Sequence, residues 1–104
     1  MISYNVFFSP RQGVDDEKVI ATVRRLLDEL GEEKKLRTYR ILKVTNPASF
    51  QALPRFQAII DYASQEELDE SLVFMRQPGK VREGTHGALI ELVTDFKVSF
   101  TADV

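Results

Sequence analysis

The chain has 104 residues and no cysteine, and 14 Lys and Arg against 16 Asp and Glu give a formal net charge of −2. This length fits one domain, residues 1–104, and the missing cysteine excludes disulfide scaffolds, thiol catalysis and cysteine-based zinc sites. The slightly acidic balance argues against nucleic acid or an anionic membrane as partner, and without a membrane-spanning run or a secretion signal we expect a cytoplasmic location.

The first residues predict a strand with one apolar and one mixed face. Apolar side chains occupy every second position: Ile2, Tyr4, Val6 and Phe8. The positions between them carry Ser3, Asn5 and Phe7. Ser9-Pro10 and Gly13 end this strand, because proline cannot donate to a β-ladder and glycine favours a turn.

From Val14 the spacing becomes that of an amphipathic helix. Apolar residues form one stripe at helical spacing: Val19, Ile20, Val23, Leu26, Leu27 and Leu30. Asp15 or Asp16 is suited to cap the start of this helix, and Gly31 is placed to end it in a left-handed turn.

Two more strands follow. The segment 36–45 alternates Tyr39 and Ile41 with polar residues but gives no clean phase, which indicates a bulge or a strand partly covered on both faces. The segment 55–63 is clearer, with inner residues Phe56, Ala58, Ile60 and Tyr62 and outer residues Gln57, Ile59 and Asp61.

The C-terminal half predicts two helices and a last strand. Ser64-Gln-Glu-Glu67 is a capping box that begins a helix ending near Arg76, and Pro78-Gly79 follows it. A short helix is expected over 84–93. From about Asp95 the chain alternates again, with Phe96, Val98 and Phe100 on one face and Lys97, Ser99 and Thr101 on the other.

The order is therefore β-α-β-β-α-(α)-β, an α+β arrangement. Two right-handed βαβ crossovers place both main helices on one face of a four-stranded antiparallel sheet, which is the ferredoxin-like arrangement. The apolar strand faces are expected to lie under the helices. The other sheet face then carries Ser3, Asn5, Phe7, Gln57, Ile59, Asp61, Lys97, Ser99 and Thr101, with Tyr39 and Ile41 as expected additions.

This second face is neither a dry core nor a fully polar surface, and three interpretations compete. In the first interpretation, two chains pack these faces together around a partly polar interior that holds a small ligand. In the second, the face stacks RNA bases, as in RNA-recognition domains. Three features disfavour this interpretation: Phe56 replaces the glycine expected there, Ile59 stands where a stacking aromatic residue is needed, and the chain is slightly acidic. In the third interpretation the face is simply solvated.

The segment Thr85-His86-Gly-Ala-Leu-Ile-Glu-Leu-Val-Thr-Asp-Phe-Lys-Val-Ser-Phe100 and the order of elements carry a resemblance. The chain resembles the dimeric α+β barrel superfamily, especially the stress-responsive α/β-barrel domain. The resemblance implies a homodimer whose sheets face one another and a pocket between sheet and helices or inside the barrel. Its members include cofactor-free oxygenases and aromatic polyketide cyclases, and in the cyclases a histidine at the position of His86 acts as base.

Single residues refine this picture. His86 is the sole histidine, so it is either a general base or a locally bonded residue at the start of a helix, and a lone histidine predicts no metal site. Asp61 either holds a ligand hydroxyl or pairs with Lys97. The loop residues Arg76, Lys80 and Arg82 form a basic cluster, for which solvation is the simpler role.

The sequence therefore predicts a homodimer through the open sheet face that binds a small, partly apolar organic ligand without a cofactor. The predicted ligand-binding residues are Asn5, Phe7, Tyr39, Gln57, Ile59 and Asp61. One alternative is a cofactor-independent oxygenase, cyclase or lyase acting on an aromatic or polyketide-like substrate, with His86 as base. The other is a non-catalytic interaction dimer.

Overall fold

The structure is a computed structural model that describes residues 1–32, 36–75 and 84–104. Its elements follow the predicted order, and their bounds are β1 Ile2–Pro10, α1 Asp16–Glu32, β2 Thr38–Lys43, β3 Phe56–Tyr62, α2 Gln65–Met75, α3 Gly84–Leu92 and β4 Val93–Ala102. The strands form one antiparallel sheet in the order β2-β3-β1-β4. The chain thus has the α+β ferredoxin-like fold that the sequence predicts.

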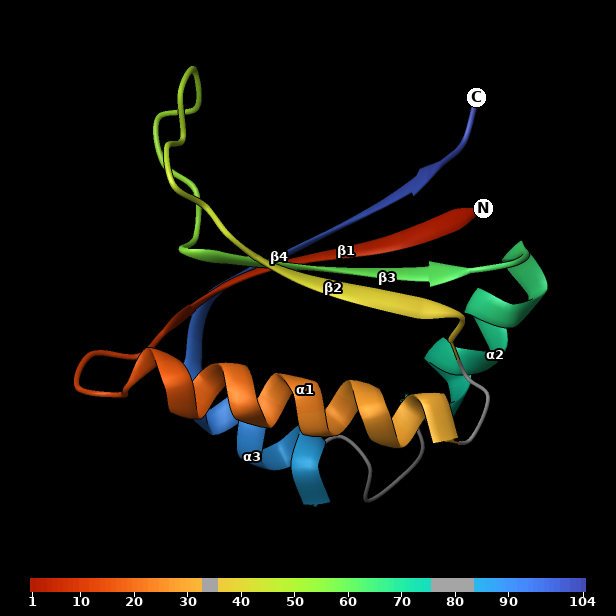
Figure 1. Ribbon diagram of the computed structural model, residues 1–104, viewed down its shortest axis with the longest axis horizontal. Coiled ribbons are helices and arrows are strands. Elements are labelled where there is room, and N and C mark those ends of the chain that lie inside the picture. The colour runs from red at the N-terminus through yellow and green to blue at the C-terminus, as the bar shows by residue number, and fades with distance from the viewer. Residues whose placement is uncertain (33–35, 76–83) are drawn as a thin grey trace.

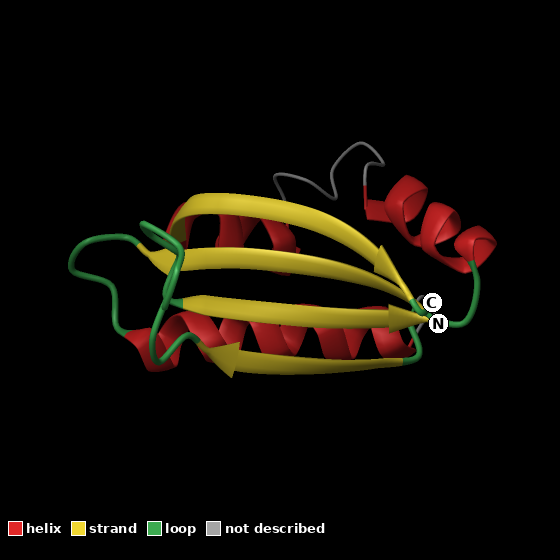
Figure 2. Ribbon diagram, turned by 90° about the horizontal axis from the view of Figure 1, so that it is seen from above, coloured by secondary structure: helices red, strands yellow, loops and turns green. Residues whose placement is uncertain are grey.

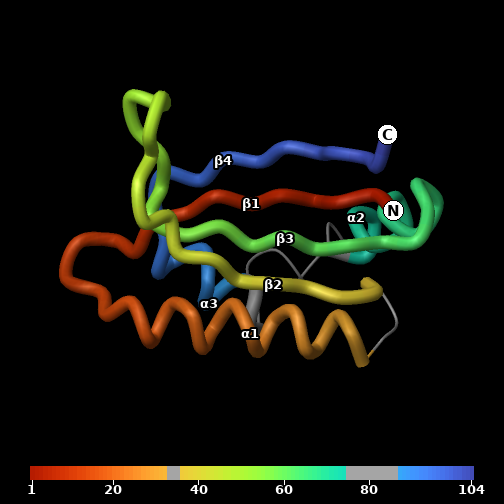
Figure 3. Tube along the Cα trace, turned by 45° about the horizontal axis from the view of Figure 1, so that its top comes forward, coloured from red at the N-terminus to blue at the C-terminus, as the bar shows by residue number. Residues whose placement is uncertain are grey.

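The sheet has one covered and one open face (Figure 1). Helices α1 and α3 lie beneath the sheet, and α2 lies at the end where the chain termini meet. Seen from above, the strands lie over α1 with no helix on the near side (Figure 2). The connection between β2 and β3, residues 44–55, rises on the open side at the other end (Figures 1 and 3).

The core lies between the covered face and the helices. Four residues of the α1 stripe are buried, at the predicted spacing: Val19, Val23, Leu27 and Leu30. The strands contribute the predicted inner residues, of which Val6, Phe8, Phe56, Ala58, Ile60 and Tyr62 are buried. Leu68 of α2 and Val93 at the start of β4 complete this core.

The predicted capping box at the start of α2 is confirmed. The Ser64 hydroxyl accepts a hydrogen bond from the backbone N–H of Glu67 at 3.2 Å, and the Glu67 carboxylate accepts one from the backbone N–H of Ala63 at 3.1 Å. The expected stop at Gly31 is wrong, because α1 continues through Gly31 to Glu32. Gly31 carries no positive φ, so it is an ordinary helical residue here.

Strand β4 differs from its prediction in coverage. It begins at Val93, and a bulge interrupts its pairing with β1, where Phe8 faces both Asp95 and Phe96. Asp95 has φ 54°, the left-handed conformation often found at such bulges. Phe96, Val98 and Phe100 do face the helix side, but they remain 55%, 40% and 53% exposed, so the expectation that the helices cover them is wrong.

Candidate functional site: an apolar cavity beneath the sheet

The open face gathers most of the predicted ligand-binding residues in three cross-strand rows. From the chain termini toward the β2–β3 connection, these rows are Thr38-Asp61-Ser3-Thr101, Arg40-Ile59-Asn5-Ser99 and Leu42-Gln57-Phe7-Lys97. The first row is polar, and the apolar side chains lie in the other two. Phe7 is the one aromatic residue that the four strands place on this face, which offers little for base stacking.

Asp61 is held by two hydroxyl groups. Its carboxylate accepts a hydrogen bond from the Ser3 hydroxyl at 2.6 Å and another from the Thr38 hydroxyl at 3.1 Å. The predicted pair with Lys97 is wrong, because Lys97 lies four residues further along the strands and pairs with Asp95. The satisfied carboxylate is therefore a structural link between β1, β3 and β2.

Asn5 is also satisfied within the sheet. It is buried in β1, one of the two central strands, and its amide donates to the Thr101 hydroxyl at 3.0 Å. On the neighbouring strand β3, Ile59 lies opposite Asn5 and Gln57 opposite Phe7, and both are half-buried. The open face thus combines internally bonded polar groups with a small apolar surface.

The predicted placement of Tyr39 and Ile41 on the open face is wrong. Tyr39 lies opposite Ile60 and Ile41 opposite Ala58, so both side chains face the helices. The Tyr39 hydroxyl donates to the Asp28 carboxylate of α1 at 2.7 Å, and this contact raises the pKa of Tyr39 above its ordinary value. Tyr39 therefore fastens the edge strand β2 to α1, and Arg40 and Leu42 take its place on the open face.

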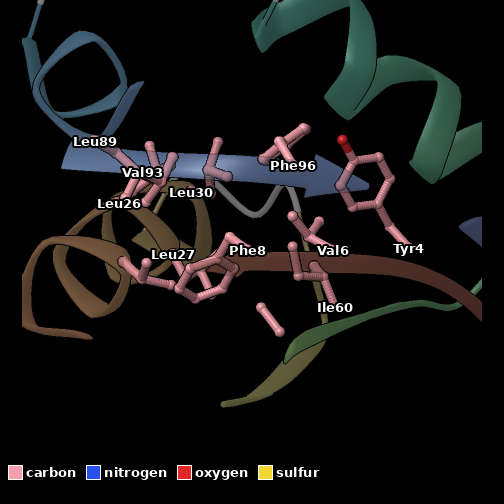
Figure 4. Close-up of a pocket in the computed structure, with 12 residues that line it drawn as sticks. Tyr4, Val6, Phe8, Leu26, Leu27, Leu30, Ile60, Leu89, Val93 and Phe96 are labelled. Atoms are coloured by element: carbon pink, nitrogen blue, oxygen red, sulfur yellow. The ribbon is translucent and has the colours of Figure 1, made fainter. Parts of the chain in front are cut away.

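A cavity of about 60 Å³ lies on the covered side, between the sheet and helices α1 and α3 (Figure 4). Twelve residues line it: Tyr4, Val6, Phe8, Val23, Leu26, Leu27, Leu30, Ala58, Ile60, Leu89, Val93 and Phe96. Tyr4 is the one lining residue with a polar side chain. Such a lining favours an apolar occupant over water, because a buried water needs two to four polar partners.

Sequence reasoning recognised these residues as core but did not predict a cavity among them. Ala58 gives the available signal, since it is the smallest side chain in the inward alternation of β3 and lies opposite Val6 and Ile41. Whether neighbouring side chains fill that space depends on the distance between sheet and helices, which the alternation does not report.

A hydroxyl pair lies beyond the cavity, where α2 packs on the sheet. The Tyr62 and Ser71 hydroxyls are 2.8 Å apart and both residues are fully buried. Burial raises the pKa of Tyr62, the hydrogen bond with Ser71 partly opposes this effect, and the neighbouring Tyr4 adds to the rise. Tyr62 is therefore a neutral hydrogen-bonding group near neutral pH and has no role as a proton acceptor there.

His86 is the third residue of α3, and its side chain lies outside the described residues. Leu89, three residues later in the same helix, lines the cavity. The basic cluster Arg76, Lys80 and Arg82 also lies outside the described residues. Within the described part of the chain, no three His, Asp or Glu residues group as metal ligands and no helix has the length and apolarity needed to cross a membrane.

The fold and the cavity place the chain in the class of ferredoxin-like α+β proteins. Within that class, residues 1–103 match the family described as "Family of unknown function (DUF6614)", and the chain belongs to this family. A search of the curated proteins finds no match.

Solved structures share the fold at low sequence identity. At3g17210 from Arabidopsis thaliana is 13% identical, with a TM-score of 0.78 over 100% of this chain and 96% of that one. SnoaB from Streptomyces nogalater, described as a cofactor-independent oxygenase, is 12% identical with a TM-score of 0.73 over 99% and 92%. A dabb family protein from Mesorhizobium loti is 13% identical with a TM-score of 0.70 over 99% and 96%. Matching proteins from Bacteroides fragilis, Thermobifida fusca and Jannaschia are described as dimeric.

Proposed function

We propose that this chain binds a small, largely apolar organic molecule in the cavity beneath the sheet, and that it does so as a homodimer joined through the open sheet face. The apolar cavity is the observation that carries the ligand-binding proposal. Asn5 and Asp61 already have partners within the sheet, so the cavity takes precedence over the open face as the ligand site. A cytoplasmic location stays a prediction.

The physical case for a ligand rests on packing. Protein interiors are close-packed. Side chains that line an empty space therefore lack van der Waals contacts on the side that faces it. Apolar cavities stay dry and bind apolar molecules of matching size. On the scale where one water needs about 10–15 Å³, a cavity of about 60 Å³ holds about four to six non-hydrogen atoms. Phenol, with seven non-hydrogen atoms, is slightly larger than this, but the cavity opens to solvent at Phe96, which lines it and is 55% exposed. The phenol hydroxyl matches the single polar side chain of the lining, Tyr4.

Ala58→Leu tests the cavity directly. The added side chain fills the space, so we expect phenol binding, measured by titration calorimetry, to weaken at least tenfold while the thermal midpoint stays the same or rises. Val73→Ala, a change on the exposed side of α2 away from both the cavity and the open face, is the control and should leave binding unchanged. Undiminished phenol binding by a folded Ala58→Leu variant would place the ligand elsewhere.

The case for a dimer rests on the open face. Phe7, Ile59 and Leu42 form an apolar surface there, and Leu42 is 36% exposed. Phe50 is 63% exposed in the connection that rises on the same side. No helix covers this face, so all four strands are available to a second chain around this apolar surface, and uncovered surface of this kind commonly marks an interaction site. The dimeric proteins with the same fold support the same conclusion.

Sedimentation equilibrium tests the dimer. We expect twice the mass of one chain for the unchanged protein and a shift to the single-chain mass for Phe7→Lys, because a charge in the centre of the interface has no partner. Val73→Lys, on the exposed side of α2, should remain dimeric. A single-chain mass for the unchanged protein at all concentrations contradicts the proposal.

A second candidate is catalysis without a cofactor on an aromatic or polyketide-like substrate, with His86 as base. Two observations favour it: SnoaB shares the fold, and Leu89 brings α3 to the cavity. Oxygen uptake with hydroxylated polycyclic aromatic compounds measures an oxygenase activity. We expect His86→Gln to reduce that uptake at least a hundredfold while phenol binding persists. If the unchanged protein and His86→Gln bind ligand and consume oxygen at the same rate, His86 is not the base, and the binding function still holds.

A further inference from the structure

An exposed apolar strip continues from the cavity along the edge strand β4. Its members are Phe96, Val98 and Phe100, which share the helix-facing side of β4 and are 40–55% exposed. Phe96 belongs to both regions, because it also lines the cavity (Figure 4). At the far end of the strip, the Phe100 ring meets the ring of Tyr4, another cavity residue, edge-on at 5.1 Å. The strip is thus joined to the cavity at both of its ends.

The bulge at Asp95 places Val93 and Phe96 on the same side of β4. Two residues of β4 face Phe8 there, and the left-handed conformation of Asp95 shifts the register by one residue. Without that extra residue, the alternation of β4 would place Phe96, Val98 and Phe100 on one side and Val93 on the other. The bulge therefore keeps Val93, at the inner end of the cavity lining, on the same side as the exposed strip.

The dimensions of the strip fit a small molecule better than a protein. From Phe96 to Phe100 the strand advances about 13 Å at 3.3 Å per residue. One strand width of three side chains is far from the roughly 800 Å² per partner that a stable protein interface buries. The polar residues between them, Lys97 and Ser99, lie on the open face opposite Phe7 and Asn5, so the strip itself is apolar.

We propose that the cavity is the inner part of a longer apolar site, which takes an elongated amphiphile with a ring-sized head in the cavity and an alkyl or fused-ring tail along Phe96, Val98 and Phe100. This inference rests on the proposed ligand binding in the cavity and adds the chemical class of the ligand. A head alone fills the cavity, whereas the tail covers the exposed strip.

A series of 4-alkylphenols from phenol to 4-hexylphenol tests the proposal by titration calorimetry. Each added methylene that lies on the strip should strengthen binding by up to about fourfold, the value for full burial. We expect this gain to continue to the longest member. In Val98→Thr, which keeps the shape of the side chain and adds a hydroxyl, phenol should bind as before while the gain per methylene falls below twofold.

Val73→Thr is the matched control, since Val73 is 64% exposed on α2 and belongs to neither the cavity nor the strip. It should reproduce the series of the unchanged protein. Phenol binding with no gain beyond the first one or two methylenes overturns the extended site and leaves the cavity as proposed. Equal losses in both Thr variants also overturn it. If phenol and every longer member fail to bind the unchanged protein, the proposed function itself fails.

Discussion

Strands β3 and β4 turn the same kind of alternating apolar stripe toward the helices, yet their surroundings differ. Phe56, Ala58 and Ile60 of β3 are 3–5% exposed, whereas Phe96, Val98 and Phe100 of β4 are 40–55% exposed. Strand β3 lies between two neighbours, and β4 lies at the edge of the sheet. Alternation thus reports the face to which a side chain points, and the place of the strand in the sheet decides whether anything covers it.

The largest expected effect comes from comparing alanine substitutions at two phenylalanines, one on β3 and one on β4. Phe56→Ala removes a ring that is buried and stacks on Phe8 at 5.9 Å, so we expect a loss of about 3–5 kcal/mol in the free energy of unfolding. Phe100→Ala removes a half-exposed ring that keeps one edge contact with Tyr4, so a loss of about 1 kcal/mol is expected. Denaturation in urea measures both.

If Phe56→Ala does not fold, Phe56→Leu can be measured in its place. We expect it to lower the free energy of unfolding by about 1–2 kcal/mol, because part of the buried volume remains. Equal losses for the alanine variants at Phe56 and Phe100 would mean that the strip on β4 is as well covered as the core.

Tyr62 provides the next test, because it brings a polar group into the buried stripe of β3. Tyr62→Phe leaves the buried Ser71 hydroxyl without its partner, and we expect a loss of about 1–2 kcal/mol. Ser71→Ala should cost a similar amount, and the double variant should cost less than the sum of the two, as expected for residues that share one hydrogen bond. Additive losses contradict the pairing.

Tyr62 also predicts a pH dependence. Its pKa in the folded chain is raised above the ordinary value of 10.0, so folding favours the protonated phenol. The corresponding stability is fully present below pH 10 and is lost as the pH rises above it toward the folded pKa. Unfolding free energies measured between pH 8 and 11 should therefore fall less in Tyr62→Phe than in the unchanged chain. Parallel curves would count against the raised pKa.

The same physical difference explains which features the sequence could predict. The faces of β1 and β3 follow from strict alternation, and the helix α1 follows from its apolar stripe. The phase of β2 does not, because Arg40 and Leu42 are as plausible toward either side as Tyr39 and Ile41 until pairing with β3 sets the register. On the open face, Ser3 and Thr38 take the place predicted for Lys97 beside Asp61 because register decides which residues are opposite.

The cavity lies beyond such patterns for a different reason. Its residues come from separate elements, and each one alone has the spacing of ordinary core. The space among them depends on how far α1 and α3 stand from a sheet that carries Ala58 at its centre. The spacing of apolar residues within each element does not determine that distance. The ligand-binding residues predicted on the open face therefore reflect what alternation can report, and the cavity reflects what packing adds.

The smallest expected effect concerns the bulge that aligns β4. Asp95 has φ 54°, a conformation that costs most L residues about 1–2 kcal/mol and costs glycine nearly nothing. Asp95→Gly should change the unfolding free energy by less than about 0.5 kcal/mol, because its contact with Lys97 is exposed and weak. Asp95→Ala should cost about 1 kcal/mol. A stability for Asp95→Ala equal to that of Asp95→Gly would mean that the bulge is not held by this residue, and the register that joins Phe96 to the cavity would then need another cause.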